Sequence, residues 1–158
     1  MTLVGDTAQT SAPAGTDDWS AALAPFVSRR FRLHELTVNY RTPAEVMEYA
    51  DAVLELGGGE KGASTSIRST GVPVAHFPSG TEVGHVRSLL DARSCAVITA
   101  DNVADMKGLE FDHVIVVEPR NIVEASPQGW QDLYVAVTRA TQTLSVIGEL
   151  KAVTAPTR

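Results

Sequence analysis

The sequence lacks the features that mark several large classes of protein. Its single cysteine, Cys95, lies in an apolar run at 95–98, which excludes an internal disulfide framework and indicates a small buried side chain. No apolar stretch approaches the roughly 20 residues that span a bilayer. The N-terminus also lacks the charged and apolar regions of a signal peptide. We therefore expect a cytoplasmic protein that has no membrane partner.

Positive charge is also scarce. Lysine and arginine number 13 against 19 aspartates and glutamates, for a formal net charge of -6. Free-standing nucleic-acid binders usually carry a basic face, so any strand contact would have to be local or shared with another segment. The four histidines, His34, His76, His85 and His113, show no metal-ligand spacing, and we expect no metal site.

What the sequence does contain is enough apolar material for one folded domain. The chain has 158 residues, of which 44% are hydrophobic. Its periodicity alternates between strand and helix, which predicts an α/β fold with an open, mostly parallel β-sheet and helices on both faces. Strands are expected at 2–6, 31–40, 72–77, 95–100, 113–118 and 144–147; helices at 18–27, 42–54, 81–92 and 128–141; and loops at 10–18, 57–66 and 121–129.

The helix that begins near residue 42 has the clearest start signal. Thr42 would be the N-cap, Pro43 the first helical residue, and Glu45 would complete a capping box. Its inward stripe would consist of Val46, Tyr49, Ala50, Val53 and Leu54.

Arg139 is the first candidate functional residue. On a helix over 128–141 it would point about 180° away from the apolar stripe that contains Leu133 and Val137, so we expect it outside the core. Ala136, one turn earlier, would leave room for an anion beside the guanidinium. The alternative is an arginine on a solvated face.

Arg41 and Glu110 leave similar alternatives open. Arg41 follows Asn39 and Tyr40 at the end of an expected strand, where parallel sheets place ligand-binding groups. Two arginines could clamp a phosphoryl group, because their donor forks match phosphate oxygens. The Glu110 carboxylate could accept hydrogen bonds from ribose hydroxyls. Either residue could instead be a solvated surface charge.

Four segments of the chain together resemble the superfamily 1 helicases of the UvrD/Rep type. Val4–Gln9 resembles their motif III, Asn39–Thr42 motif IV, Lys107–Asp112 motif V and Tyr134–Ala140 motif VI, in the family's order. The resemblance spans nearly the whole chain. It implies the C-terminal, second RecA-like domain of an ATP-dependent motor.

The resemblance also implies a role for each matched residue. Gln9 would sense the γ-phosphate of ATP, and Arg41 and Arg139 would contact it, which makes these three the catalytic candidates. The candidates for cofactor binding are Tyr40, which would stack on adenine, Glu110, which would bind ribose, and the motif V residues Lys107 and Gly108. The implied cofactor is ATP with Mg²⁺.

Half of such a site is missing from the sequence. There is no G-x-x-x-x-G-K-[ST] phosphate-binding loop and no acidic pair to hold magnesium. The resemblance places both in an N-terminal RecA-like domain of the same protein. Residues 1–16 would then be the end of that domain and a linker, 17–151 the second domain and 152–158 a tail. We expect the strand at 2–6 to be frayed, swapped or paired in a non-native way, and the chain alone to be inactive.

Some positions depart from the UvrD pattern. Gln9 is followed by residues 10–13 without the aromatic pair that stacks on single-stranded bases, and Asn102 and Ala104 replace a Thr-x-His pattern. These departures look more like the HelD or helicase IV-like branch, whose HelD members act on RNA polymerase. There are then three hypotheses: a helicase or translocase on single-stranded DNA, an ATPase that remodels RNA polymerase, and a non-catalytic docking module. The retained Gln9, Arg41, Glu110 and Arg139 weigh against the third.

Overall fold

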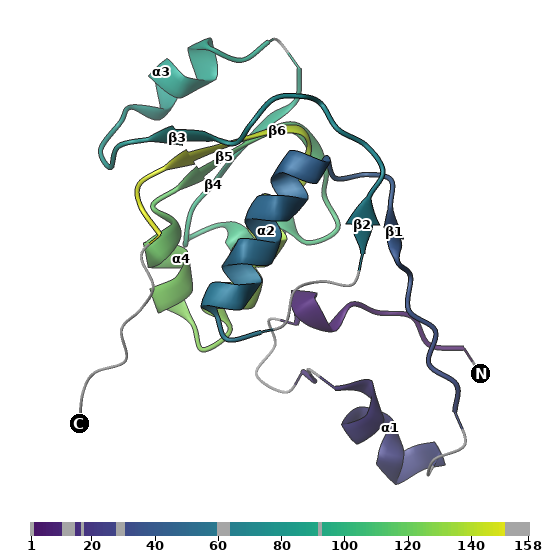
Figure 1. Cartoon of the computed structure of the whole chain (residues 1–158). Helices are drawn as coiled ribbons and strands as arrows, with labels where there is room; N and C mark the ends of the chain where they lie inside the picture. The colour runs from purple at the N-terminus through teal and green to yellow at the C-terminus, as the bar shows by residue number, and fades with distance from the viewer. Residues whose placement is uncertain are drawn as a thin grey trace.

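Four parallel strands form the main sheet, in the order β3-β6-β5-β4 (Figure 1). The structure is a computed structural model that describes residues 2–10, 15–16, 18–27, 31–59, 64–91 and 93–150. In chain order the strands are β3 (Ala75–Phe77), β4 (Cys95–Ile98), β5 (Phe111–Val117) and β6 (Ala140–Ile147). Their pairings are all parallel, which confirms the open parallel sheet predicted from the alternation of strands and helices.

Helices cover both faces of this sheet because its central strands are apolar on both sides. In β5, Val114 and Val116 face the larger core, whereas Ile115 faces a smaller one. The larger core is completed by α2 (Ala44–Leu56), α4 (Pro119–Ala125) and α5 (Gly129–Val137), and the smaller one by α3 (Val83–Ser88). In Figure 1, α2 crosses in front of the sheet. The predicted fold class is therefore confirmed, including helices on both faces.

The predicted stripe of α2 is confirmed, but its predicted capping box is wrong. The helix begins at Ala44, and the buried Thr42 hydroxyl has no hydrogen-bond partner among the described residues. The Glu45 carboxylate instead accepts hydrogen bonds from the Gly71 amide, at 2.8 Å, and from the Ser69 hydroxyl. Glu45 therefore joins the start of α2 to a turn that is distant in sequence, which local spacing could not reveal.

The predicted strand over 31–40 is almost entirely wrong. Only β1 (Val38–Asn39) is extended and paired, and its partner is the short parallel strand β2 (Thr65–Ser66). The Thr37 carbonyl still accepts from the Thr65 amide at 2.8 Å, but residues 31–36 pair with no strand of the described part of the chain, and Leu33 and Leu36 are exposed. An alternating pattern stabilises a strand only when a second strand pairs with it.

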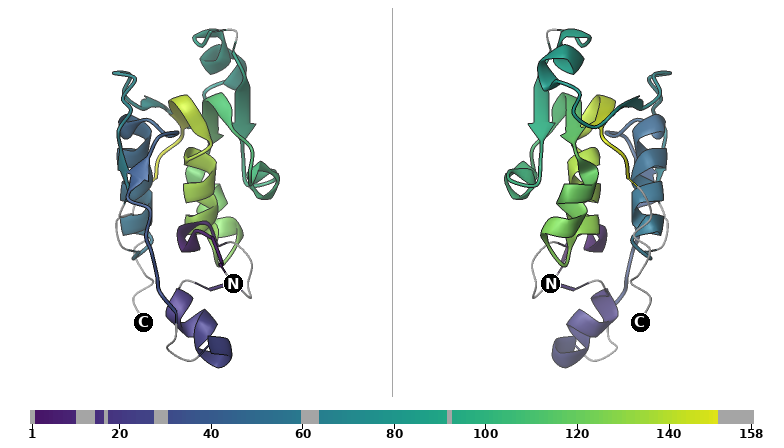
Figure 2. Two further views of the ribbon diagram at one scale, coloured as in Figure 1. Left: turned by 90° about the vertical axis from the view of Figure 1, so that its right-hand side faces the viewer. Right: turned by 90° about the vertical axis from the view of Figure 1, so that its left-hand side faces the viewer.

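The N-terminal part of the chain contains one predicted helix and a short 3-10 turn. Helix α1 (Trp19–Val27) has nearly the predicted bounds but buries none of its residues, and Phe26 is 83% exposed. Figure 2 shows α1 at the end of the molecule away from the sheet. The 3-10 turn η1 (Thr7–Gln9) packs against α5, and residues 2–6 before it form no strand, in agreement with the frayed strand expected there.

The later part of the chain corrects several other boundaries. A helix, α4, occupies part of the predicted loop at 121–129, because Pro119 starts it and Ile122 and Val123 are buried. Helix α5 ends at Val137 rather than near residue 141, and β6 starts at Ala140. β3 and α3 are shorter than predicted. The expected tail at 152–158, and parts of the expected loops at 10–18 and 57–66, lie outside the described residues.

Gly129 lets α4 and α5 approach each other closely. A β-carbon built on Gly129 would lie 2.0 Å from the carbonyl oxygen of Val123, which is backbone that cannot turn away. The Gly129→Ala variant should therefore lower the free energy of unfolding by about 3 kcal/mol, as overpacking does. Denaturant unfolding measures this change. Gly84→Ala is the control: Gly84 lies in α3 with nothing within 4 Å, so alanine there should stabilise by about 0.5–1 kcal/mol. Equal effects at both positions would refute the close approach.

The Glu45 contacts should make part of the stability depend on acid pH. The Ser69 hydroxyl bond and the backbone amides lower the pKa of Glu45 from 4.5 to about 2. Since the folded value is the lower one, this stabilisation is present above pH 4.5 and is lost as pH falls towards 2. Glu45→Gln should therefore lower Tm at neutral pH, and the difference from the wild type should shrink towards pH 2. Glu48→Gln, at an exposed position on the same helix, is the control and should show no such convergence.

Candidate functional site

Three of the candidate residues meet at the amino edge of the main sheet. Glu110 and Arg139 immediately precede β5 and β6, and the Phe111 amide donates to the Arg139 carbonyl at 3.0 Å. Arg41 arrives from the end of β1, and its Nη1 lies 2.7 Å from the Glu110 Oε1. Arg41 thus follows a strand and Glu110 precedes one, as the sequence predicted. Arg139 precedes β6 rather than lying on a helix.

Arg139 is buried, contrary to the prediction that it points out of the core. It is 2% exposed and is among the largest fully buried side chains. The prediction used the angular spacing of a helix over 128–141, but α5 ends at Val137, and Arg139 lies in the turn before β6. That turn directs the Arg139 side chain into the interior, towards the Val135 and Leu109 carbonyl oxygens. The solvated alternative for Arg139 is excluded by the same burial.

The guanidinium of Arg139 is held entirely by neutral oxygen atoms. It forms no ion pair within the described part of the chain. Its Nε donates to the Val135 carbonyl at 3.1 Å and its Nη1 to the Leu109 carbonyl at 3.4 Å. Its Nη2 donates to the Gln9 Oε1 at 3.2 Å and to the Thr138 Oγ1 at 3.3 Å. A buried charge without an ion-pair partner is costly, and an anion in contact with it would offset that cost.

Neighbouring charged side chains also act on the Arg139 guanidinium. Burial lowers the pKa of Arg139, and the like charge of Arg41 lowers it further, while Glu110 opposes both effects. Arginine stays protonated at physiological pH in spite of such shifts. The site therefore combines two guanidinium groups with the carboxylates of Glu110 and, more distantly, Asp6, and neither carboxylate forms an ion pair with Arg139.

Gln9 is oriented by Asp6. Its Nε2 donates to the Asp6 Oδ2 at 2.7 Å, which leaves its Oε1 to accept from Arg139. Asp6 also caps η1, because its Oδ1 accepts from the Ala8 amide at 3.0 Å. The carboxylate thus fixes both the turn and the direction of the Gln9 amide.

The backbone of Arg41 is also fixed. The Asn39 Oδ1 accepts from the Arg41 amide at 2.9 Å and from the Thr42 amide at 3.1 Å, which forms an Asx turn. The Arg41 carbonyl accepts from the Arg68 guanidinium at 3.2 Å. Only the side chain of Arg41 is therefore free to change partners.

The remaining candidates lie outside the arginine cluster. The Tyr40 side chain is 70% exposed. Lys107 and Gly108 form the centre of a type II turn, closed by the Leu109 amide donating to the Met106 carbonyl at 3.2 Å. Gly108 has a φ of 75° and open space around it, so the turn conformation explains this glycine without a close ligand. No hydrogen bond or ion pair links Lys107 to the other candidates within the described residues.

Asp6 and Thr138 lie within the motif segments but were not predicted to take part in the site, and Tyr134 was expected only in the apolar stripe of its helix. Burial, and next the charges of Asp6 and Asp51, raise the pKa of Tyr134 to about 12. The Thr138 hydroxyl donates to the Tyr134 carbonyl at 2.8 Å and accepts from Arg139. Only the bend of the chain after α5 reveals this arrangement.

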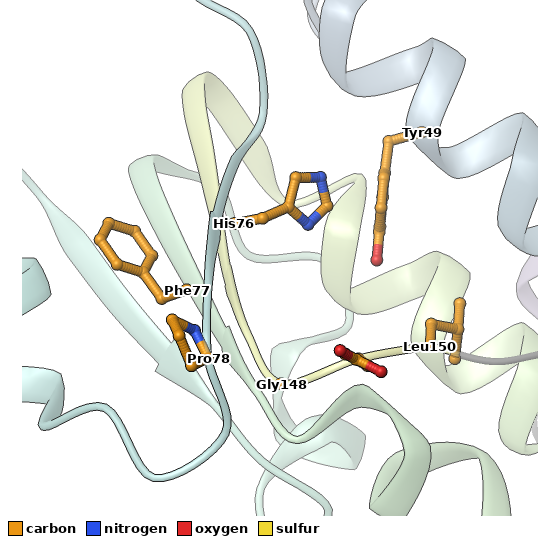
Figure 3. Close-up of a pocket in the computed structure, with 7 residues that line it drawn as sticks. Tyr49, His76, Phe77, Pro78, Gly148 and Leu150 are labelled. Carbon is orange, nitrogen blue, oxygen red and sulfur yellow. The ribbon is translucent and has the colours of Figure 1, made fainter.

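An open pocket of about 470 Å³ lies at the opposite, carboxyl edge of the sheet (Figure 3). The rings of Tyr49 and His76 meet there, with centroids 5.7 Å apart. The other lining residues are Phe77, Pro78, Gly148, Glu149 and Leu150. None of the candidate site residues lines it. Among the described residues no group of three or more His, Cys, Asp or Glu could hold a metal ion, and no helix is long and apolar enough to cross a membrane.

The chain is an α/β domain in which Arg41, Glu110 and Arg139 cluster at the amino edge of the main sheet. Residues 97–147, about a third of the chain, match the family of UvrD-like helicase C-terminal domains. This part of the chain is therefore similar to that family, and it contains Lys107, Gly108, Glu110 and Arg139. Gln9, Tyr40 and Arg41 lie outside the matched segment.

Among solved structures, the chain is similar to the C-terminal domain of a possible DNA helicase from Lactobacillus plantarum WCFS1. The sequence identity is 22%, 77% of each chain is covered and the TM-score is 0.25. At so low a TM-score this likeness carries no argument about the site. No curated protein matches the chain.

The burial of Arg139 predicts an unusual effect on stability. Arg139→Met should raise the free energy of unfolding by about 1 kcal/mol, because an apolar side chain of similar size removes an uncompensated buried charge. Chemical denaturation measures the change. As a control, Arg120→Met breaks the exposed pair with Glu124 and should alter stability by less than about 1 kcal/mol. A loss above about 2 kcal/mol in Arg139→Met would instead show that its hydrogen bonds hold the fold together.

Proposed function

We propose that this chain is the C-terminal motor domain of an ATP-dependent superfamily 1 DNA helicase or translocase. The observation that carries the proposal is the 2% exposure of Arg139, a guanidinium surrounded by neutral acceptors. Arg41 adds a second guanidinium on the open side of the cluster. The match of residues 97–147 to UvrD-like helicase C-terminal domains supports a nucleotide-driven motor over other polyanion binders.

The residues at this edge fit the parts of ATP. Guanidinium forks match phosphate oxygens, an exposed aromatic ring such as Tyr40 offers a face to a base, and the Glu110 carboxylate accepts from sugar hydroxyls. The described residues offer no cluster for Mg²⁺, so we assign the metal ligands to an N-terminal RecA-like domain. The ATP site is then shared between two domains.

The chemistry assigned to this chain is the stabilisation of charge. When bound, ATP would supply the phosphoanhydride bond that is cleaved, and Mg²⁺ would neutralise charge on its phosphates. Arg139 and Arg41 would donate hydrogen bonds to phosphoryl oxygens, where negative charge develops in the transition state. Gln9, held by Asp6, keeps Arg139 in place from the other side.

The link to single-stranded DNA is weaker than the link to ATP. The chain carries a net charge of -6, and Gln9 is not followed by aromatic residues. Base stacking contributes about 1–3 kcal/mol per base, so its absence here weakens the grip on a strand. We place the main DNA contacts in the rest of the full-length protein.

The same missing aromatic pair favours a second candidate, a HelD-like ATPase that remodels RNA polymerase. A non-catalytic docking module is disfavoured by the site itself. Such a module would gain nothing from a buried arginine without an opposite charge, because burying that charge costs stability.

The test uses the full-length protein that carries this domain. Arg139→Met and Arg41→Gln should each lower the kcat of ATP hydrolysis by about a thousandfold, as the loss of an arginine finger does. Arg120→Gln, which breaks a surface ion pair elsewhere, is the control and should leave kcat unchanged. Near-normal turnover in both cluster variants would rule out the phosphate assignment. The chain alone should bind ATP no better than in the millimolar range.

Stimulation of the same ATPase separates the two candidate motors. A strong rise in rate with single-stranded DNA, and none with RNA polymerase, supports the helicase or translocase. The reverse pattern supports the polymerase-remodelling ATPase.

A further inference from the structure

Arg41 and Glu110, which fit different parts of the nucleotide, are bound to each other in this structure. Their side chains form an ion pair of 2.7 Å, and they remain 40% and 49% exposed. The group proposed to bind phosphate and the group proposed to bind ribose are therefore paired with each other. Any role of this pair in choosing a ligand rests on the proposed function.

The side chains of Arg41 and Glu110 can exchange partners without a change in the backbone. The backbone of Arg41 is held by Asn39 and that of Glu110 by the first rung of β5, so only the side chains need to move. An exposed ion pair shifts an equilibrium by about fivefold at most, so a phosphate can displace the carboxylate. Arg139, in contrast, is buried, and its guanidinium is already hydrogen-bonded to neutral oxygen atoms.

The consequence of displacement depends on the ligand. A bare polyphosphate that takes Arg41 leaves the Glu110 carboxylate unpaired beside its own negative charge, and like charges repel. A ribonucleoside triphosphate brings hydroxyl donors for that carboxylate at the moment its phosphates take the guanidinium. Both side chains then gain a new partner, Arg41 a phosphate and Glu110 a hydroxyl.

We propose that Glu110 is a specificity-determining residue: by pairing with Arg41, it reserves the phosphate-binding arginines for polyphosphates that also carry sugar hydroxyls. The ligand class selected is nucleoside triphosphates over inorganic polyphosphates. Glu110 thus acts on selectivity through Arg41, in addition to any contact of its own with ribose.

The test compares inorganic tripolyphosphate with ATP, each titrated at low ionic strength into the chain and followed by NMR chemical shifts. Glu110→Gln should tighten tripolyphosphate binding about fivefold, the equivalent of one exposed ion pair. ATP affinity should stay the same or weaken, so the preference for ATP should fall by fivefold or more. Asp112→Asn removes a carboxylate two residues along the chain, which hydrogen-bonds Ser94, and should change neither affinity.

A double variant separates partner exchange from a general loss of negative charge. The gain in tripolyphosphate affinity should disappear when Arg41→Gln accompanies Glu110→Gln. A gain that persists in the double variant, a gain of equal size in Asp112→Asn, or no gain in Glu110→Gln would each overturn the proposal. So would a wild-type chain that binds tripolyphosphate as well as it binds ATP.

These outcomes can be told apart from failure of the proposed function. If Glu110→Gln shows no gain but Arg139→Met abolishes turnover in the full-length protein, only the selectivity role of Glu110 fails. If Glu110→Gln shows the gain while Arg139→Met turns over ATP normally, the masking of Arg41 stands and the motor assignment fails.

Discussion

The burial of the Arg139 charge without a carboxylate partner is the constraint on which the candidate site depends. The guanidinium is enclosed because α5 ends two residues earlier and the chain turns sharply into β6. Its neutral partners come from η1, from the turn before β5 and from the end of α5. Three segments far apart in the sequence thus converge on one positive charge, which explains why the site lies at the amino edge of the sheet.

That convergence also accounts for the contacts around the two arginines. Asp6 orients Gln9 towards Arg139, and Asn39 fixes the backbone from which Arg41 extends. Glu110 pairs with Arg41 and offsets part of the repulsion between the two arginines. The cluster therefore holds two guanidinium groups, the Glu110 carboxylate beside Arg41 and the Asp6 carboxylate beyond Gln9. The Arg139 guanidinium itself has no ion-pair partner among the described residues, and in the proposed function a phosphate group takes that place.

The sequence predicted the fold well where apolar periodicity and burial coincide. β4, β5 and the stripe of α2 follow directly from apolar runs, and they set the parallel sheet. Prediction was wrong where the outcome depends on a distant partner. Residues 31–36 alternate like a strand but pair with none among the described residues, and Glu45 bonds to the turn at 69–71 rather than to its own helix. For the site, motif order identified Arg41, Glu110 and Arg139, but their ion pair and burial are tertiary properties that no local pattern contains.

The most direct measurement is the NMR signal of the Arg139 side-chain Nε–Hε group in the full-length protein, recorded as Mg²⁺ and ATP are added. Burial and the bond to the Val135 carbonyl should make this resonance resolved and slow to exchange. If Arg139 contacts the nucleotide, the resonance should shift in step with ATP binding, together with that of Arg41. An Arg139 resonance that stays unmoved while ATP binds would contradict this assignment, because the nucleotide would then lie elsewhere.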